Sequence, residues 1–79
     1  MLDLVKIRYA VMSKANTSDF VYYEDEQYEY YDFKYFNEVV QIRKIKFADV
    51  FQFKISNSSI VIEFGNVDEL IEYLDKELI

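Results

Sequence analysis

The sequence contains no cysteine, histidine, proline or tryptophan, and its only glycine is Gly65. Without cysteine and histidine, the chain can form neither a disulfide nor a zinc site of the usual ligands. It also has no thiolate nucleophile and no ordinary general base near neutral pH. A single glycine excludes a glycine-rich phosphate loop. These absences indicate a protein that is not an enzyme and that has no catalytic residue, cofactor or metal.

The length and charge of the chain restrict its organisation and its partners. Seventy-nine residues form one small domain, 1–79. The net charge of −6 is unevenly distributed, with −6 in residues 19–38, +3 in residues 39–54 and −4 in residues 66–79. Such a chain repels nucleic acid and anionic membranes and attracts basic protein surfaces. Because there is no long apolar run or secretion signal, we expect a soluble, cytoplasmic protein.

Nine of the fifteen aromatic residues lie in residues 20–38, interleaved with six carboxylates and a single base, Lys34. A domain this small cannot bury all these rings and neutralise all these charges at once, so we interpret the stretch as a recognition surface. Tyrosine suits a protein interface, because it brings a large contact area and a polar tip at a small entropic cost. Stacking on nucleic-acid bases would instead require a basic groove, whereas these rings lie among acids.

The first half of the chain predicts strands. Residues 2–12 alternate, with Val5, Ile7, Tyr9 and Val11 on one side, which is typical of a half-buried strand. Residues 13–19 are polar turn formers and predict a loop. Residues 20–23 begin a second strand, which we expect to end at the acidic residues 24–26. Residues 28–36 fit both a strand and a helical period, and their aromatic content favours a strand.

The basic residues 39–47 also predict a strand, but their apolar side chains change face midway. A β-bulge at Arg43 and Lys44 would return them to one face. A basic patch for nucleic acid could form from Arg43, Lys44, Lys46 and Lys54. We favour the alternative that they pair with the acidic stretch, within the fold or across a dimer, because opposite charges commonly face each other on adjacent strands.

Residues 51–64 predict a β-hairpin. A two-residue turn at Asn57 and Ser58 places six apolar residues on one face by pairing Phe51 with Phe64, Phe53 with Ile62 and Ile55 with Ile60. For the preceding connection we favour a three-residue loop, 48–50, which pairs Phe47 with Phe51 and Ile45 with Phe53.

A helix is predicted after Gly65. Asn66 can cap it, and Glu69 completes an Asn-x-x-Glu capping box. One apolar stripe follows, of which Leu70, Ile71 and Leu74 should pack on the sheet, while the outward positions include Asp68, Glu72, Asp75 and Glu77. The predicted fold is α+β, an antiparallel sheet of four to five strands with one C-terminal amphipathic helix packed on one face. The other face of the sheet is left open.

The leading functional hypothesis is a small acidic inhibitor or adaptor that covers a basic, nucleic-acid-binding surface of a larger protein. Carboxylates held on strands and on the helix would replace phosphates in such a cleft, which is DNA mimicry. In size, charge and aromatic content, the chain is similar to phage-encoded inhibitors of CRISPR nucleases and of uracil-DNA glycosylase. That similarity implies an anti-defence role in the cytoplasm of a host cell. The predicted partner-binding residues are Tyr22, Tyr23, Glu24, Asp25, Glu26, Glu29, Asp32, Asp68, Glu72 and Asp75.

Other interpretations remain open. Residues 24–26 and Glu29 could be a solvated acidic loop, or a calcium site, although the order of ligands in an EF-hand is missing. The chain could also be a homo-oligomeric structural or regulatory module that buries its open aromatic sheet face against a second copy. A nucleic-acid binder that uses the basic middle strands is a third class. It predicts affinity for oligonucleotides at low salt.

Overall fold

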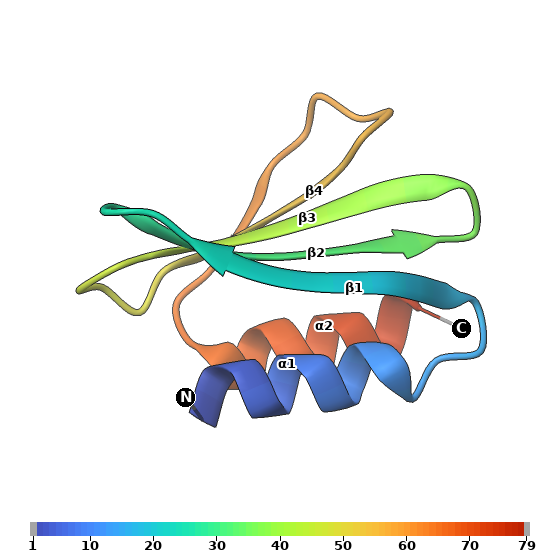
Figure 1. The fold of residues 1–79 in the computed structure, drawn as a ribbon, viewed down its shortest axis with the longest axis horizontal. Coiled ribbons are helices and arrows are strands. Elements are labelled where there is room, and N and C mark those ends of the chain that lie inside the picture. Colours follow the sequence, from blue (N-terminus) through green and yellow to red (C-terminus); the bar gives the residue numbers. More distant parts are fainter. Residues whose placement is uncertain (1, 79) are drawn as a thin grey trace.

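The structure, a computed structural model, describes residues 2–78. Two helices flank five strands in chain order (Figure 1). The elements are α1 (Leu2–Met12), β1 (Thr17–Glu24), β2 (Tyr28–Tyr35), β3 (Glu38–Ile45), β4 (Phe51–Ile55), β5 (Ile62–Phe64) and α2 (Val67–Glu77). The fold is therefore α+β, as predicted.

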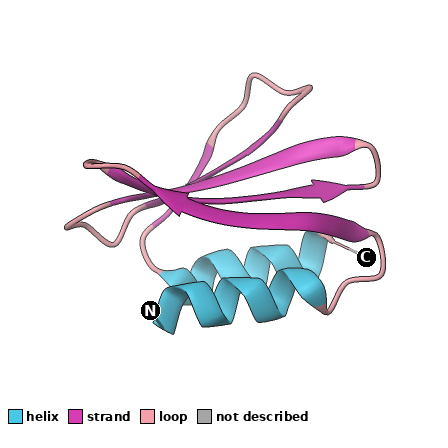
Figure 2. Ribbon diagram, viewed as in Figure 1, coloured by secondary structure: helices cyan, strands magenta, loops and turns pink. Residues whose placement is uncertain are grey.

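The strands form one antiparallel sheet in the order β1-β2-β3-β4-β5, so each strand pairs with its neighbour in the chain. Both helices lie on the same side of this sheet and leave the other side open (Figure 2). Each helix contacts the strand to which it is joined, α1 with β1 and α2 with β5, and the two helices contact each other. The C-terminal helix and the open face agree with the prediction, whereas the N-terminal helix was not expected.

The core lies between the helices and the sheet. Side chains that point to this side of the sheet alternate along each strand, as a sheet with one covered face requires. The buried residues of the core, from both helices and the sheet, are Ile7, Ala10, Val11, Tyr31, Phe33, Val40, Ile42, Phe51, Phe53, Leu70, Leu74 and Leu78.

The prediction of a strand at residues 2–12 was wrong, because this segment is α1. Ile7 and Val11 are buried at helical spacing, while Val5 and Tyr9, which the alternation placed on the same face, are 63% and 78% exposed. Apolar residues occur at so many positions in this segment that they satisfy both periods. As a helix, this segment contacts α2 and β1. These partners are distant in the sequence, so the local pattern does not reveal the contacts.

The connection after α1 is shorter than the predicted loop 13–19, because β1 already begins at Thr17. The Thr17 hydroxyl donates to the carbonyl oxygens of Val11 (2.7 Å) and Lys14 (3.0 Å) and so joins the start of the strand to the end of the helix. A register shift between Ser18 and Val21 follows, where Asp19 has a φ of 55°. Asp tolerates this left-handed conformation better than most residues.

Residues 28–35 form a strand, β2, as their aromatic content predicted. The bulge predicted at Arg43 and Lys44 is wrong, because β2 and β3 pair without interruption from Tyr28 with Ile45 to Tyr35 with Glu38. The change of parity instead marks the end of the strand. Phe47 lies in the following turn with a φ of 67° and is 99% exposed.

The connection from β3 to β4 also differs from the prediction. Phe51 pairs with Lys44 and Phe53 with Ile42, rather than with Phe47 and Ile45, so the connection spans residues 46–50. This register keeps Ile42 and Phe53 together on the covered side of the sheet. A shift by one residue would turn one of the two side chains to the open side.

The hairpin of β4 and β5 has the predicted register, with Phe51 paired to Phe64 and Phe53 to Ile62. The pairing does not continue to Ile55 and Ile60, so the two-residue turn is not formed. Residues 56–61 instead form a loop that projects from the open side of the sheet (Figure 1). Side-chain hydrogen bonds stabilise this loop, since the Asn57 amide donates to Glu38 Oε1 (2.6 Å) and the Ile60 backbone N–H donates to Ser58 Oγ (3.0 Å).

The cap predicted for α2 is present. Asn66 is the N-cap, and its side-chain oxygen accepts the Glu69 backbone N–H at 2.9 Å. The Glu69 carboxylate accepts a hydrogen bond from the backbone N–H of Gly65 (3.1 Å). In a standard capping box the donor would be the N–H of the N-cap residue, here Asn66.

Candidate functional site

The predicted acidic and aromatic residues of β1 and β2 do not form one surface. Side chains alternate along a strand, so Tyr22, Glu24 and Glu29 lie on the side of the sheet that carries the helices. Tyr23 and Asp32 lie on the open side, where the Tyr23 hydroxyl donates to Asp32 Oδ2 at 2.8 Å. The period of two therefore divides the predicted site between two faces.

On the covered side, the carboxylates take part in internal ion pairs. Glu29 lies opposite Lys44, with 3.7 Å between Oε2 and Nζ, and Lys44 Nζ is also 3.6 Å from Asp3 Oδ2 in α1. Glu24 pairs with Lys46 at 3.1 Å. For Lys44 and Lys46, the favoured prediction of pairing with the acidic stretch within the fold is confirmed. Glu29 is both neutralised by Lys44 and mostly buried, so it makes a poor substitute for a phosphate.

Two tyrosine hydroxyls form hydrogen bonds with Glu24 and Glu29. The hydroxyl of Tyr31 donates to Glu29 Oε1 at 3.0 Å, and the hydroxyl of Tyr22 lies 3.4 Å from both Glu29 and Glu24. Burial, together with the Glu29 charge, raises the pKa of Tyr22 to about 12. Burial and the hydrogen bond to Glu29 raise the pKa of Tyr31 as well. Both phenols therefore stay neutral and act as donors that orient Glu29.

The turn between β1 and β2 is organised by Asp25. Its carboxylate accepts the backbone N–H groups of Gln27 (2.8 Å) and Tyr28 (2.7 Å) and the hydroxyl of Tyr30 (2.8 Å). The bond from Tyr30, followed by the two backbone bonds, lowers the pKa of Asp25. Glu26 is exposed at the tip of the turn. Within residues 2–78 no three acidic side chains converge as the calcium interpretation requires.

On the open side, Tyr23 stacks on Tyr30 with ring centroids 4.6 Å apart and an interplanar angle of 17°. The hydrogen bond to Asp32 is the main factor that raises the pKa of Tyr23 to about 12. The second carboxylate oxygen of Asp32, Oδ1, is buried and has no hydrogen-bond partner among the described residues. Burial raises the pKa of Asp32, and the bond from Tyr23 offsets only part of this rise.

The three predicted residues of α2 lie at helical spacing and form an exposed acidic ridge, defined as Asp68, Glu72 and Asp75. Its two ends face α1, where Asp68 pairs with Lys6 and Asp75 with Lys14, each at 3.2 Å. Both carboxylates remain well exposed, so these pairs add little stability and leave the acids accessible.

Sequence reasoning missed the apolar residues beside this ridge. The apolar stripe of α1, defined as Leu2, Val5, Tyr9 and Met12, is exposed along the whole helix. Its members follow one another at intervals of three and four residues, the signal of a second helix face. The prediction of a strand concealed this signal, because it placed Val5 and Tyr9 in the core.

Two shallow hollows adjoin the apolar stripe, one on either side of Tyr9. The first has a volume of about 380 Å³ and is lined by Val5, Arg8, Tyr9, Met12 and Ser13. The second has a volume of about 320 Å³ and also includes Asp68 and Asp75 of the acidic ridge. The outer surface of the helix layer therefore combines exposed apolar side chains with acids.

Phe47 is a second missed residue, since it was assigned to the core. It extends from the turn between β3 and β4, next to the acidic turn of residues 25–27, because the Lys46 backbone N–H donates to the Gln27 carbonyl at 2.8 Å. The turn from β1 to β2 and the turn from β3 to β4 lie at the same end of the sheet (Figure 1). The exposed ring of Phe47 is therefore near Asp25 and Glu26.

No helix of residues 2–78 is both long enough and apolar enough to cross a membrane. Comparison of the chain with protein-family models, curated proteins and solved structures gave no match.

Proposed function

We propose that the protein is a non-catalytic binding module that docks on a larger protein through the outer surface of its helix layer. The partner is a basic amphipathic segment, whose apolar side chains cover the apolar stripe and whose Lys or Arg residues contact the acidic ridge. The exposure of the apolar stripe on α1 is the observation that carries this proposal.

The apolar character of this surface supports a protein partner. Single exposed apolar residues are ordinary, but contiguous apolar patches usually mark interaction sites. Four exposed apolar side chains follow one face of α1, and two hollows border the largest of them, Tyr9. Tyr9 is the expected anchor, because aromatic residues that fill hollows on a partner contribute most to binding energy.

The charge supports a basic partner over a second copy of this chain. Asp68 and Asp75 of the acidic ridge line the second hollow together with Lys6, while Arg8 lines the first. Glu72 of the ridge is exposed and forms no ion pair within residues 2–78, so the ridge retains negative charge. Two copies of a chain with a charge of −6 would bring two such ridges together. Like charges across an interface cost several kcal/mol as an order of magnitude, whereas a basic segment is attracted and guided into place.

The biological role that follows is that of an inhibitor or adaptor of phage or mobile-element type. A basic segment on a larger protein often serves to bind nucleic acid, so a module that covers it blocks that activity. In this form of the hypothesis, the contacts come from α1 and the acidic ridge. Glu29, whose side chain is only 17% exposed, has a structural role instead. The absence of histidine and cysteine from the sequence supports a non-catalytic role.

The test is affinity capture from host-cell lysate with three forms of the tagged full chain. These are the wild type, the double variant Val5→Gln/Tyr9→Gln, and the control Val21→Thr, which alters an exposed apolar residue on the opposite side of the sheet. Glutamine is a good helix former, so the double variant should fold. Circular dichroism checks this.

We expect the wild type and the control to retain one protein that leaves the column at moderate salt, and the double variant to lose it. The purified partner should then bind directly, and the ridge variant Glu72→Gln should weaken this binding and reduce its salt dependence. Retention of the same protein by the double variant would contradict the proposal. A wild-type dimer in light scattering, converted to a monomer by the double variant, would assign the surface to a second copy.

A further inference from the structure

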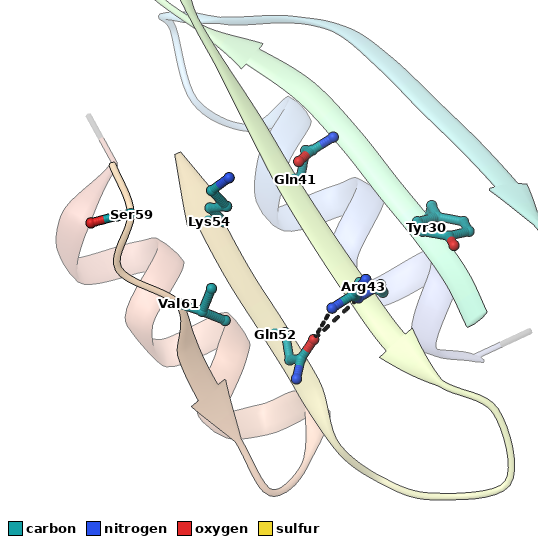
Figure 3. Close-up of a pocket in the computed structure, with 7 residues that line it drawn as sticks. All are labelled: Tyr30, Gln41, Arg43, Gln52, Lys54, Ser59 and Val61. Atoms are coloured by element: carbon teal, nitrogen blue, oxygen red, sulfur yellow. Dashed lines mark hydrogen bonds between the residues drawn. The ribbon is translucent and has the colours of Figure 1, made fainter. Parts of the chain in front are cut away.

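The open face of the sheet contains a groove on the side opposite the helices. It has a volume of about 490 Å³ and is lined by Tyr30, Gln41, Arg43, Gln52, Lys54, Ser59 and Val61. Arg43, Gln52 and Lys54 project from β3 and β4, while Ser59 and Val61 come from the loop that rises beside them (Figure 3). This volume is within the range of small-ligand sites.

The charge of the groove is opposite to that of the protein. Among the described residues that line it, there are two cations and no carboxylate. Elsewhere the chain neutralises most of its lysines, since Lys6, Lys14, Lys34, Lys44 and Lys46 all form ion pairs. Within residues 2–78, neither Arg43 nor Lys54 forms an ion pair with a carboxylate. Two unneutralised cations in one groove of an acidic protein favour an anionic ligand.

Arg43 is held in place before any ligand binds. Its Nε and Nη2 donate to Gln52 Oε1 at 3.1 and 2.6 Å, and its guanidinium lies 4.5 Å from the ring centroid of Tyr28. Gln52 is in turn fixed by its bond to Glu63 at 2.9 Å. Guanidinium carries five N–H donors, and among the described residues only two of them are used, so others can bind an oxyanion at a small entropic cost.

We propose that this groove binds a nucleoside monophosphate. The phosphate lies between Arg43 and Lys54, where a guanidinium and an ammonium supply charge-assisted hydrogen bonds. The base lies against Tyr30, and the carboxamide of Gln41 is available to bond its polar edge. Val61 closes the apolar side of the groove, and the Ser59 hydroxyl provides a further donor. This site is on the opposite side of the sheet from the surface of the helix layer, so the two proposals are independent.

The experiment is a titration of the ¹⁵N-labelled full chain with adenosine 5′-monophosphate at low ionic strength, followed by NMR. Adenosine, inorganic phosphate and a short oligoadenylate serve as separate arms. The variants are Lys54→Gln, which changes an exposed side chain, and Lys76→Gln, a matched control. Lys76 is an exposed lysine of α2 that forms no ion pair within residues 2–78. Lys54→Gln avoids Arg43, whose contacts with Tyr28 and Gln52 also support the sheet.

We expect saturable shifts at the amides of Gln41, Gln52, Lys54 and Val61 and at the side-chain Nε–H of Arg43. Lys54→Gln should weaken the affinity by about tenfold, the usual effect of losing one charge-assisted contact, while Lys76→Gln leaves it unchanged. Equal affinity in Lys54→Gln, or binding of phosphate or adenosine as tightly as the nucleotide, would overturn the proposal. Binding of the oligoadenylate without the mononucleotide would also overturn it and assign the face to a nucleic-acid strand.

Discussion

Glu29 and Lys44 lie directly opposite each other on β2 and β3, and their side chains are only 17% and 16% exposed. Lys44 also reaches Asp3, so this lysine ties α1 to the sheet. The pair is thus the point where the acidic stretch, the basic strand and the N-terminal helix meet.

Removing either partner of this pair should destabilise the fold. Lys44→Met leaves Glu29 and Asp3 without their cation in a mostly buried place, and we expect a loss of about 1–3 kcal/mol. Urea unfolding measures it. The exposed pair of Lys34 and Asp19 is the control, since Lys34→Met should cost no more than about 1 kcal/mol. Equal effects of the two substitutions would contradict the structural role assigned to Lys44.

The helical state of residues 2–12 predicts opposite effects at two residues that a strand would place together. Ile7→Ala removes a fully buried side chain and should lower the free energy of unfolding by about 2–5 kcal/mol. Val5→Ala changes an exposed position and should alter it by no more than about 0.5 kcal/mol. The same urea experiment tests both. Comparable losses at the two positions would indicate a strand instead of α1.

The two carboxylates Asp25 and Asp32 should affect the pH dependence of stability with opposite signs. Burial raises the pKa of Asp32 in the folded state, so this group contributes stability at low pH that is lost as the pH rises through its folded pKa. Hydrogen bonds, first that from Tyr30, lower the pKa of Asp25, so its contribution is present at neutral pH and lost on acidification.

Asp32→Asn should therefore gain stability relative to the wild type as the pH rises from acid to neutral, whereas Asp25→Asn should lose stability over the same range. Urea unfolding at a series of pH values checks both variants. A loss in Asp32→Asn that grows with pH would show that its ionised form is stabilised in the fold.

Phe47 occupies a backbone conformation that suits glycine. Its φ of 67° lies in the left-handed region, which costs a residue with a Cβ roughly 1 kcal/mol, and its exposed ring has almost no contacts to lose. Phe47→Gly should exceed Phe47→Ala in stability by about 1 kcal/mol, because alanine keeps the strain and glycine relieves it. Thermal or urea unfolding compares the two. A more stable alanine variant would mean that the turn is not strained.

The parts of the fold that could be predicted depend on local chemistry. The cap of α2 needs only Asn66 and Glu69 at the right spacing, and the hairpin register follows from the alternation of Phe51 and Phe53 against Ile62 and Phe64. By contrast, the predictions of a bulge and of a three-residue loop after β3 were wrong because both require Phe47 to be buried, whereas it is exposed. Nothing in the sequence marks an aromatic residue that a turn exposes.

The candidate surfaces were harder to predict, because each depends on which side of an element a residue occupies. The acidic residues of β1 and β2 were recognised, but the alternation of strand side chains sent Glu29 toward α1 and Asp32 to the open face. The apolar stripe of α1 became visible only once residues 2–12 were helical. The groove required Arg43 and Lys54, from adjacent strands, to lie together on the uncovered face.

The sequence by itself determined the chemical limits of this protein, its α+β class and its uneven charge, since these depend on residue types and short-range patterns. Only the tertiary structure decided the conformation of residues 2–12 and which charges are neutralised. The physical reason is that the apolar residues of this segment fit two periods equally well, and burial of Ile7 and Val11 against distant elements selects between them. In the same way, the pairing of Lys44 with Asp3 and Glu29 requires three segments to meet, which no local pattern specifies.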